Sequence, residues 1–119
     1  MLSLLVTTIL SADVVKQSGE KNGYKVNLYT ENPLISGNND FFVKLSQNGT
    51  NVDNAKVKIK VFMPEMPGMP YMEYKAKAKL VNGVYKMMIN FSMGGTWQYH
   101  LKFKTIDKKV HTIRGSVNI

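Results

Sequence analysis

The chain has 119 residues, of which 44% are hydrophobic and 20% are charged, as in one ordinary globular domain. Its formal net charge is +8, and Arg114 is its only arginine among sixteen basic residues. Arginine makes most base-edge and bidentate phosphate contacts, so this lysine excess argues against sequence readout, and we expect no nucleic-acid partner. Cysteine is absent, which excludes disulfides, thiolate metal sites and cysteine nucleophiles.

The first residues resemble an export signal. Residues 1–12 are uncharged and apolar, and they end in Ser11-Ala12, which resembles a signal cleavage site. The stretch is too short to span a bilayer as a helix. No basic residue precedes Lys16, so either the true start lies upstream of Met1 or the segment is a buried first strand. We expect 1–12 to be a signal-peptide remnant, and the mature protein to be a periplasmic single domain at 13–119 without a transmembrane segment.

Short runs of alternating polar and apolar residues follow. A period of two with one polar face is typical of half-buried antiparallel strands, and Asn82-Gly83 between two such runs predicts a hairpin. Trp97 and Met87 are expected in the core. The pattern predicts an all-β, immunoglobulin-like antiparallel β-sandwich of seven or eight strands. The expected strands are residues 13–18, 24–29, 41–46, 55–62, 72–81, 84–91, 96–105 and 110–118.

The stretch "FMPEMPGMPYM", residues 62–72, holds four of the eight methionines at a spacing of three. They are Met63, Met66, Met69 and Met72, and proline follows each of the first three. The prolines exclude a continuous helix and a central strand. They favour polyproline-II geometry, in which residues three apart lie on one ridge. Gly68 is the expected hinge if several methionines are to meet at one site.

Thioethers on an exposed loop suggest two kinds of function. A thioether is soft and uncharged, so it selects Cu(I) or Ag(I) over zinc, magnesium and calcium. Thioethers also adapt to apolar protein surfaces, so the loop could instead dock on a partner. Strand direction adds Met93 to the candidate ligands, because the connection after residues 84–91 should return to the same end as the methionine loop. Met88 is expected to face outward.

Other chemistry has little support in the sequence. His100 and His111 lack a metal-binding spacing, and His111 should open the last strand at the opposite end. No acidic pair, serine nucleophile motif or phosphate-binding glycine loop is present. We therefore expect no enzymatic activity.

Three segments carry a family resemblance: residues 62–72, Asn82-Gly83-Val84-Tyr85, and the run from Phe91 to Trp97. Over residues 24–119 the chain resembles the YtkA-like/FixH-like domain family, and it is most similar to bacterial copper resistance determinants. The resemblance implies an immunoglobulin-like sandwich and a periplasmic copper-binding protein that serves copper tolerance beside a tripartite efflux pump. Many family members carry histidine near this loop. Its absence here favours Cu(I) over Cu(II).

Overall fold

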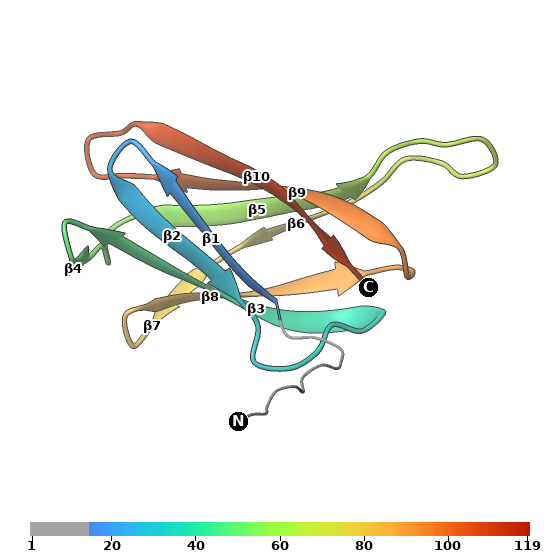
Figure 1. The fold of residues 1–119 in the computed structure, drawn as a ribbon, viewed down its shortest axis with the longest axis horizontal. Coiled ribbons are helices and arrows are strands. Elements are labelled where there is room, and N and C mark those ends of the chain that lie inside the picture. The colour runs from blue at the N-terminus through green and yellow to red at the C-terminus, as the bar shows by residue number, and fades with distance from the viewer. Residues whose placement is uncertain (1–14) are drawn as a thin grey trace, which may run out of the picture.

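Among the residues that the structure describes, ten antiparallel strands form two sheets that pack face to face (Figure 1). The computed structural model describes residues 15–119, and the expected signal-peptide remnant lies outside them. The strands are β1 (Lys16–Lys21), β2 (Tyr24–Tyr29), β3 (Gly37–Gln47), β4 (Thr50–Asn51), β5 (Lys56–Met63), β6 (Met72–Lys77), β7 (Lys79–Val81), β8 (Val84–Phe91), β9 (Thr96–Lys104) and β10 (Val110–Asn118).

The first sheet, sheet A, has the order β1-β2-β3-β8-β7, and the short β4 pairs with β3. The second, sheet B, has the order β10-β9-β5-β6. The expected all-β antiparallel sandwich is confirmed. The expected number of strands is wrong, because β4 was not predicted and residues 72–81 form two strands instead of one.

The division of residues 72–81 occurs at Ala78. Its N–H donates to the carbonyl of Val57 at 2.9 Å, and the chain then leaves sheet B and joins sheet A as β7. Polar and apolar residues keep alternating through this point, so the sequence pattern does not reveal that the pairing partner changes. A change of partner is a property of the tertiary fold.

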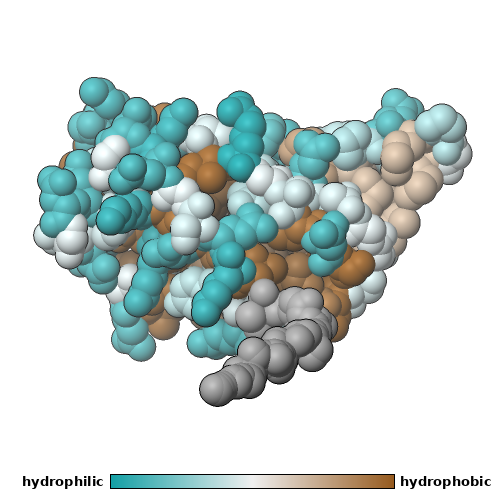
Figure 2. Space-filling model, in the orientation of Figure 1, coloured by the Kyte–Doolittle hydropathy of each residue, from teal (hydrophilic) through white to brown (hydrophobic). Residues whose placement is uncertain are grey.

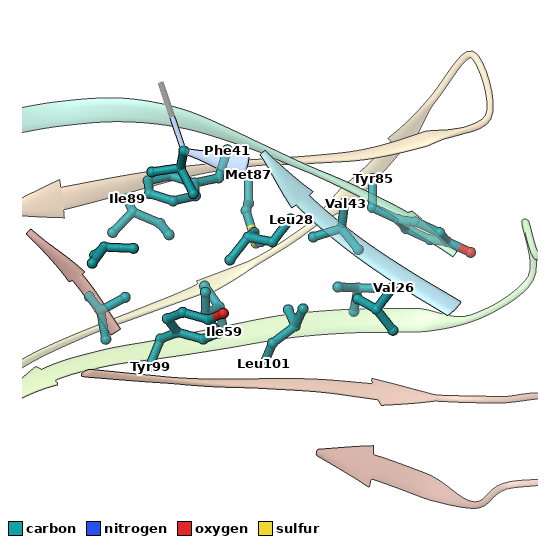
Figure 3. Close-up of a cluster of buried hydrophobic side chains, with 14 of the residues drawn as sticks. Val26, Leu28, Phe41, Val43, Ile59, Tyr85, Met87, Ile89, Tyr99 and Leu101 are labelled. Atoms are coloured by element: carbon teal, nitrogen blue, oxygen red, sulfur yellow. The ribbon is translucent and has the colours of Figure 1, made fainter. Parts of the chain in front are cut away.

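The inward faces of both sheets form the core. Phe41, Met87 and Ile89 enter from sheet A, whereas Ile59 and Leu101 enter from sheet B (Figure 3). These side chains alternate with exposed neighbours along each strand, as expected for half-buried strands. Trp97 is 1% exposed and Met87 is 3% exposed, so both predicted core positions are confirmed.

Two connections lie together at one end of the sandwich. The long connection at residues 64–71 joins β5 to β6, and the short one at 92–95 joins β8 to β9. Because β5 pairs antiparallel with β9, the end of β5 lies beside the start of β9, with Phe62 opposite Gln98. We call this the methionine end, and Figure 1 shows the long connection projecting from it as an arm.

Candidate metal centre

The arm at residues 64–71 is a β-hairpin extension, not the polyproline-II ridge predicted from the sequence. Met66 and Met69 exchange two backbone hydrogen bonds, of 2.9 and 2.8 Å, across the Pro67-Gly68 tip. Gly68 has φ of 79°, which fits the third position of a type II turn with proline before it. The expected bend at Gly68 is confirmed. The predicted ridge fails because this turn folds the chain back on itself.

The hairpin arranges the four loop methionines as two cross-strand pairs. Met63 is in register with Met72 at the base of the arm, and Met66 is in register with Met69 at its tip. Directly opposed residues have Cβ atoms about 4.5–5.5 Å apart. The two pairs are separated by three residues, or about 10 Å of extended chain. Pairing across the hairpin therefore brings thioethers together two at a time.

The connection at residues 92–95 approaches the base pair. The Ser92 hydroxyl donates to the Met72 sulfur at 3.4 Å. A Cβ atom built at Gly95 would lie only 2.9 Å from the Met63 methyl group. Met93 lies between these two contacts in the sequence and packs against the core. The structure therefore brings Met63, Met72 and the connection that carries Met93 to the same end of the sandwich, and the predicted position of Met93 at the methionine end is confirmed.

Buried and terminal groups hold the Met93 connection in place. The indole N–H of Trp97 donates to the Met93 carbonyl at 3.1 Å, so the core tryptophan also positions this residue. The backbones of Gly95 and Ile119 exchange two further hydrogen bonds, of 2.9 and 3.3 Å. A connection fixed at these points presents Met93 with little conformational freedom.

The five methionines differ in access to solvent. Met63 is 4% exposed and belongs to the core, because it continues the inward alternation of Val57, Ile59 and Val61 along β5. Met69, Met72 and Met93 are half-buried and contact the core. Met66 is 46% exposed at the tip. An ion entering from solvent would meet the half-buried thioethers first, with Met63 behind them.

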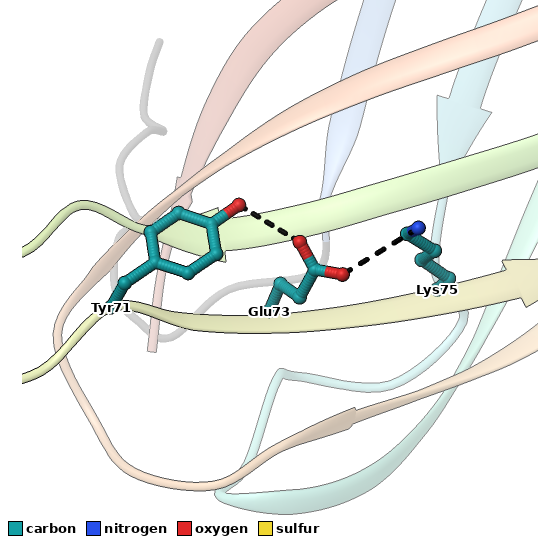
Figure 4. Close-up of polar contacts among 3 residues, drawn as sticks. All are labelled: Tyr71, Glu73 and Lys75. Atoms are coloured by element: carbon teal, nitrogen blue, oxygen red, sulfur yellow. Dashed lines mark hydrogen bonds and ion pairs between the residues drawn. The ribbon is translucent and has the colours of Figure 1, made fainter.

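The outward side of the arm base carries polar contacts instead of thioethers (Figure 4). The Tyr71 hydroxyl donates to Glu73 at 2.9 Å, and Lys75 forms an ion pair with the same carboxylate at 3.6 Å. Desolvation and the Glu73 carboxylate raise the pKa of Tyr71 above its usual value. Both oxygens of Glu73 are therefore engaged by neighbouring side chains.

The two histidines lie away from the methionines. His100 is in register with Lys60 on the outer face of sheet B, where its ring lies 5.0 Å from that of Phe62. His111 lies at the opposite end of the sandwich, as predicted. It is buried there, contacting Asn22 at 2.8 Å, Thr105 at 3.3 Å and the ring of Phe103 at 4.9 Å between centroids.

Harder ligands do not gather anywhere in the described chain. No group of three His, Cys, Asp or Glu side chains that could hold a metal occurs among residues 15–119. The donor set at the methionine end is thus composed of soft, uncharged thioethers.

Within residues 15–119 there is also no helix with the length and apolar character needed to span a membrane.

Sequence reasoning missed two contributors to this end of the molecule. Ser92 was not singled out, because a hydroxyl-to-thioether contact has no sequence pattern. Gly95 is the second contributor, because its φ of 132° and its contact with Met63 exclude a side chain. The double glycine directly after Met93 was the available signal for this close approach.

A family model described as YtkA-like matches residues 18–102. No curated protein and no solved structure matches the chain.

Proposed function

Because the chain belongs to the YtkA-like family, we propose that it is an exported Cu(I)-binding protein that buffers or carries copper in the periplasm. The proposed ligands are Met63, Met66, Met69, Met72 and Met93. The proposed role is copper resistance or trafficking, of the kind that bacterial copper resistance determinants serve beside a tripartite metal-efflux pump. The copper ion is cargo in this proposal, and no enzymatic step is involved.

The convergence of Met63, Met72 and Met93 is the observation that carries the proposal. These residues come from three places in the sequence, and the fold brings them to one end of the sandwich. A core built only for stability has no need of half-buried thioethers at its rim. Soft uncharged sulfur favours Cu(I), and Ag(I) is the expected substitute ion.

The exposed arm supports a second candidate function. Met66 and Tyr71 are 46% and 47% exposed, and Figure 2 shows tan and pale residues on the projecting arm, with a teal group at its upper edge. Such an apolar projection suits docking on a partner protein, such as an efflux component. This function needs the shape and apolarity of the arm and does not need sulfur.

Competition with a coloured Cu(I) chelator tests the proposal. The purified domain should withdraw Cu(I) from the chelator, and Met72→Leu/Met93→Leu should abolish this while keeping the fold, because leucine conserves apolar volume. Failure of the unmodified domain to compete would contradict copper binding. Retention of copper by the double variant would show that Met72 and Met93 are not ligands.

A matched control uses the two methionines of β8. Met87 is buried in the core and Met88 is 43% exposed on the outer face of sheet A, away from the methionine end. Met87→Leu/Met88→Leu removes the same number of sulfurs and should leave Cu(I) competition unchanged. Equal losses in both double variants would mean that sulfur content, not position, governs binding.

A further inference from the structure

The outer face of sheet B carries an unusual concentration of lysine. Strand pairing places Lys58 of β5 directly opposite Lys77 of β6 and Lys102 of β9. Neighbouring positions on the same face extend the patch, which we call the lysine face. Its basic residues are Lys56, Lys58, Lys60, Lys75, Lys77, Lys102, Lys104 and Arg114.

The lysine face has little internal neutralisation. It holds half of the sixteen lysine and arginine residues of the chain. Glu73 is the one acid among the described residues that the four strands of sheet B direct outward, and it is engaged with Tyr71 and Lys75. Desolvation lowers the pKa of His100 on this face, and the cations of Arg114, Lys60 and Lys102 lower it further.

This arrangement works against stability. Like charges placed directly opposite each other on a sheet repel, and the cost is greatest for a residue with two such neighbours. Lys58 is in that position, between Lys77 and Lys102. An uncharged polar residue would keep the strand soluble without the repulsion. Repulsion of this kind is relieved when an anionic partner covers the face.

The lysine face is grooved. One groove of about 350 Å³ is lined by side chains of β5, β6 and β9, among them Lys60, Lys75 and His100. A second groove of about 600 Å³ adjoins it, and Lys58, Lys77 and Lys102 line both. The second groove also has apolar lining residues: Val57, Ala78, Leu80 and Val110.

We propose that the lysine face binds an extended acidic polypeptide segment of a partner protein, with carboxylates along the side that faces the sheet and apolar side chains at one end of that side. The carboxylates match the lysines, and the apolar side chains match Leu80 and Val110, which are 45% and 57% exposed. A flat anionic membrane fits a grooved surface less well. Single-stranded nucleic acid stacks its bases on free aromatic rings. Tyr85 in the second groove is buried with its hydroxyl bonded to Val52, and the rings of His100 and Phe62 beside the first groove already pack on each other, with Lys60 over the Phe62 ring.

A labelled peptide of Glu-Ala repeats provides a direct probe, with fluorescence anisotropy as the readout. The peptide should bind the domain, and binding should weaken as salt is raised. Lys58→Glu/Lys77→Glu/Lys102→Glu should weaken it about tenfold or more, since each reversal turns an attraction into a repulsion. Absence of binding to the unmodified domain would overturn the proposal. Thermal melting checks that the reversal variant folds. If it does not, glutamine at the same three positions replaces it, and this milder variant should also weaken peptide binding.

Lys16→Glu/Lys25→Glu/Lys44→Glu is the matched control, because it changes net charge equally on the outer face of sheet A. This control should bind the peptide about as tightly as the unmodified domain does, and therefore more tightly than the lysine-face variant by about tenfold or more. Equal weakening in both would show a net-charge effect and overturn the site. Oligothymidylate and phosphatidylglycerol vesicles are the competing probes. Tighter binding of either one would overturn the assigned partner class. These outcomes are independent of copper, so they are distinguishable from failure of the proposed function.

Discussion

The methyl group of Met63 occupies the space where a side chain on Gly95 would begin, 2.9 Å from the ideal Cβ position. Gly95 also has φ of 132°, a conformation that L-residues rarely adopt. The contact joins the end of β5 to the connection before β9. It therefore links Met63, the buried methionine at the base of the arm, to the segment that carries Met93.

Gly95→Ala should destabilise the domain by about 1–3 kcal/mol, the usual cost of a side chain in a sparsely populated backbone region. The Met63 methyl group must also move, so Cu(I) competition should weaken in the same variant. Gly94→Ala is the control, because its nearest neighbour is the Ile119 carbonyl at an ordinary 3.4 Å. Urea denaturation measures both, and an equal change in the two variants would show that Gly95 has no special role.

Met66→Leu/Met69→Leu removes the tip pair and leaves the base pair. We expect Cu(I) affinity to fall, but less than in Met72→Leu/Met93→Leu, because the base methionines are backed by buried Met63. The melting temperature should barely change, since leucine conserves volume and apolarity. Chelator competition compares the two variants, and a larger loss from the tip pair would place the main site on the arm.

Cu(I) affinity should stay nearly flat between about pH 7 and pH 5. Thioethers bind no proton in this range, whereas a histidine ligand with a reference pKa of about 6.5 would be lost. His100 lies on the outer face of sheet B and His111 at the opposite end, so neither should contribute. Repeating the competition across this range is the measurement. A fall that follows a histidine titration, and disappears in His100→Gln, would add His100 to the site.

His100 should titrate below its ordinary pKa of 6.5, because of partial desolvation and the cations of Arg114, Lys60 and Lys102. The unfolded chain then binds the proton more tightly than the folded one. Stability from this group is present above the unfolded pKa and is lost as pH falls through the folded pKa. NMR titration measures the value. Arg114→Gln should raise it and Lys16→Gln should not, so an unchanged pKa in Arg114→Gln would contradict the assigned cause.

Lys58→Gln should stabilise the domain at low salt by about 0.2–1 kcal/mol, because it removes repulsion from Lys77 and Lys102. The gain should shrink as salt is raised, since the charges are exposed and screened. Lys44→Gln is the control, because Lys44 is in register with Asn27 and not with another lysine. Thermal melts at two salt concentrations measure the effect, and destabilisation by Lys58→Gln at low salt would show that the repulsion is already relieved.

Local pattern was enough to predict most of the strands and their inward faces, although not β4 or the division of residues 72–81. Trp97 and Met87 lie inside and Met88 lies outside because side-chain direction alternates along a strand, whatever its partners are. The same alternation, counted through short connections, placed Met93 beside the methionine loop and His111 at the other end. These results depend only on residues close together in the sequence.

Pairing between strands was decided by the tertiary structure. Only the pairing of Met66 with Met69 has a local signal, the Pro67-Gly68 turn, which the regular spacing of the prolines obscured. The change of sheet at Ala78 depends on which surfaces meet, because polar and apolar residues alternate in the same way before and after it. The lysine face arises in the same way, because β5 pairs with β6 on one side and β9 on the other. Contacts between distant segments depend on the packing of whole sheets, so no short stretch of sequence encodes them.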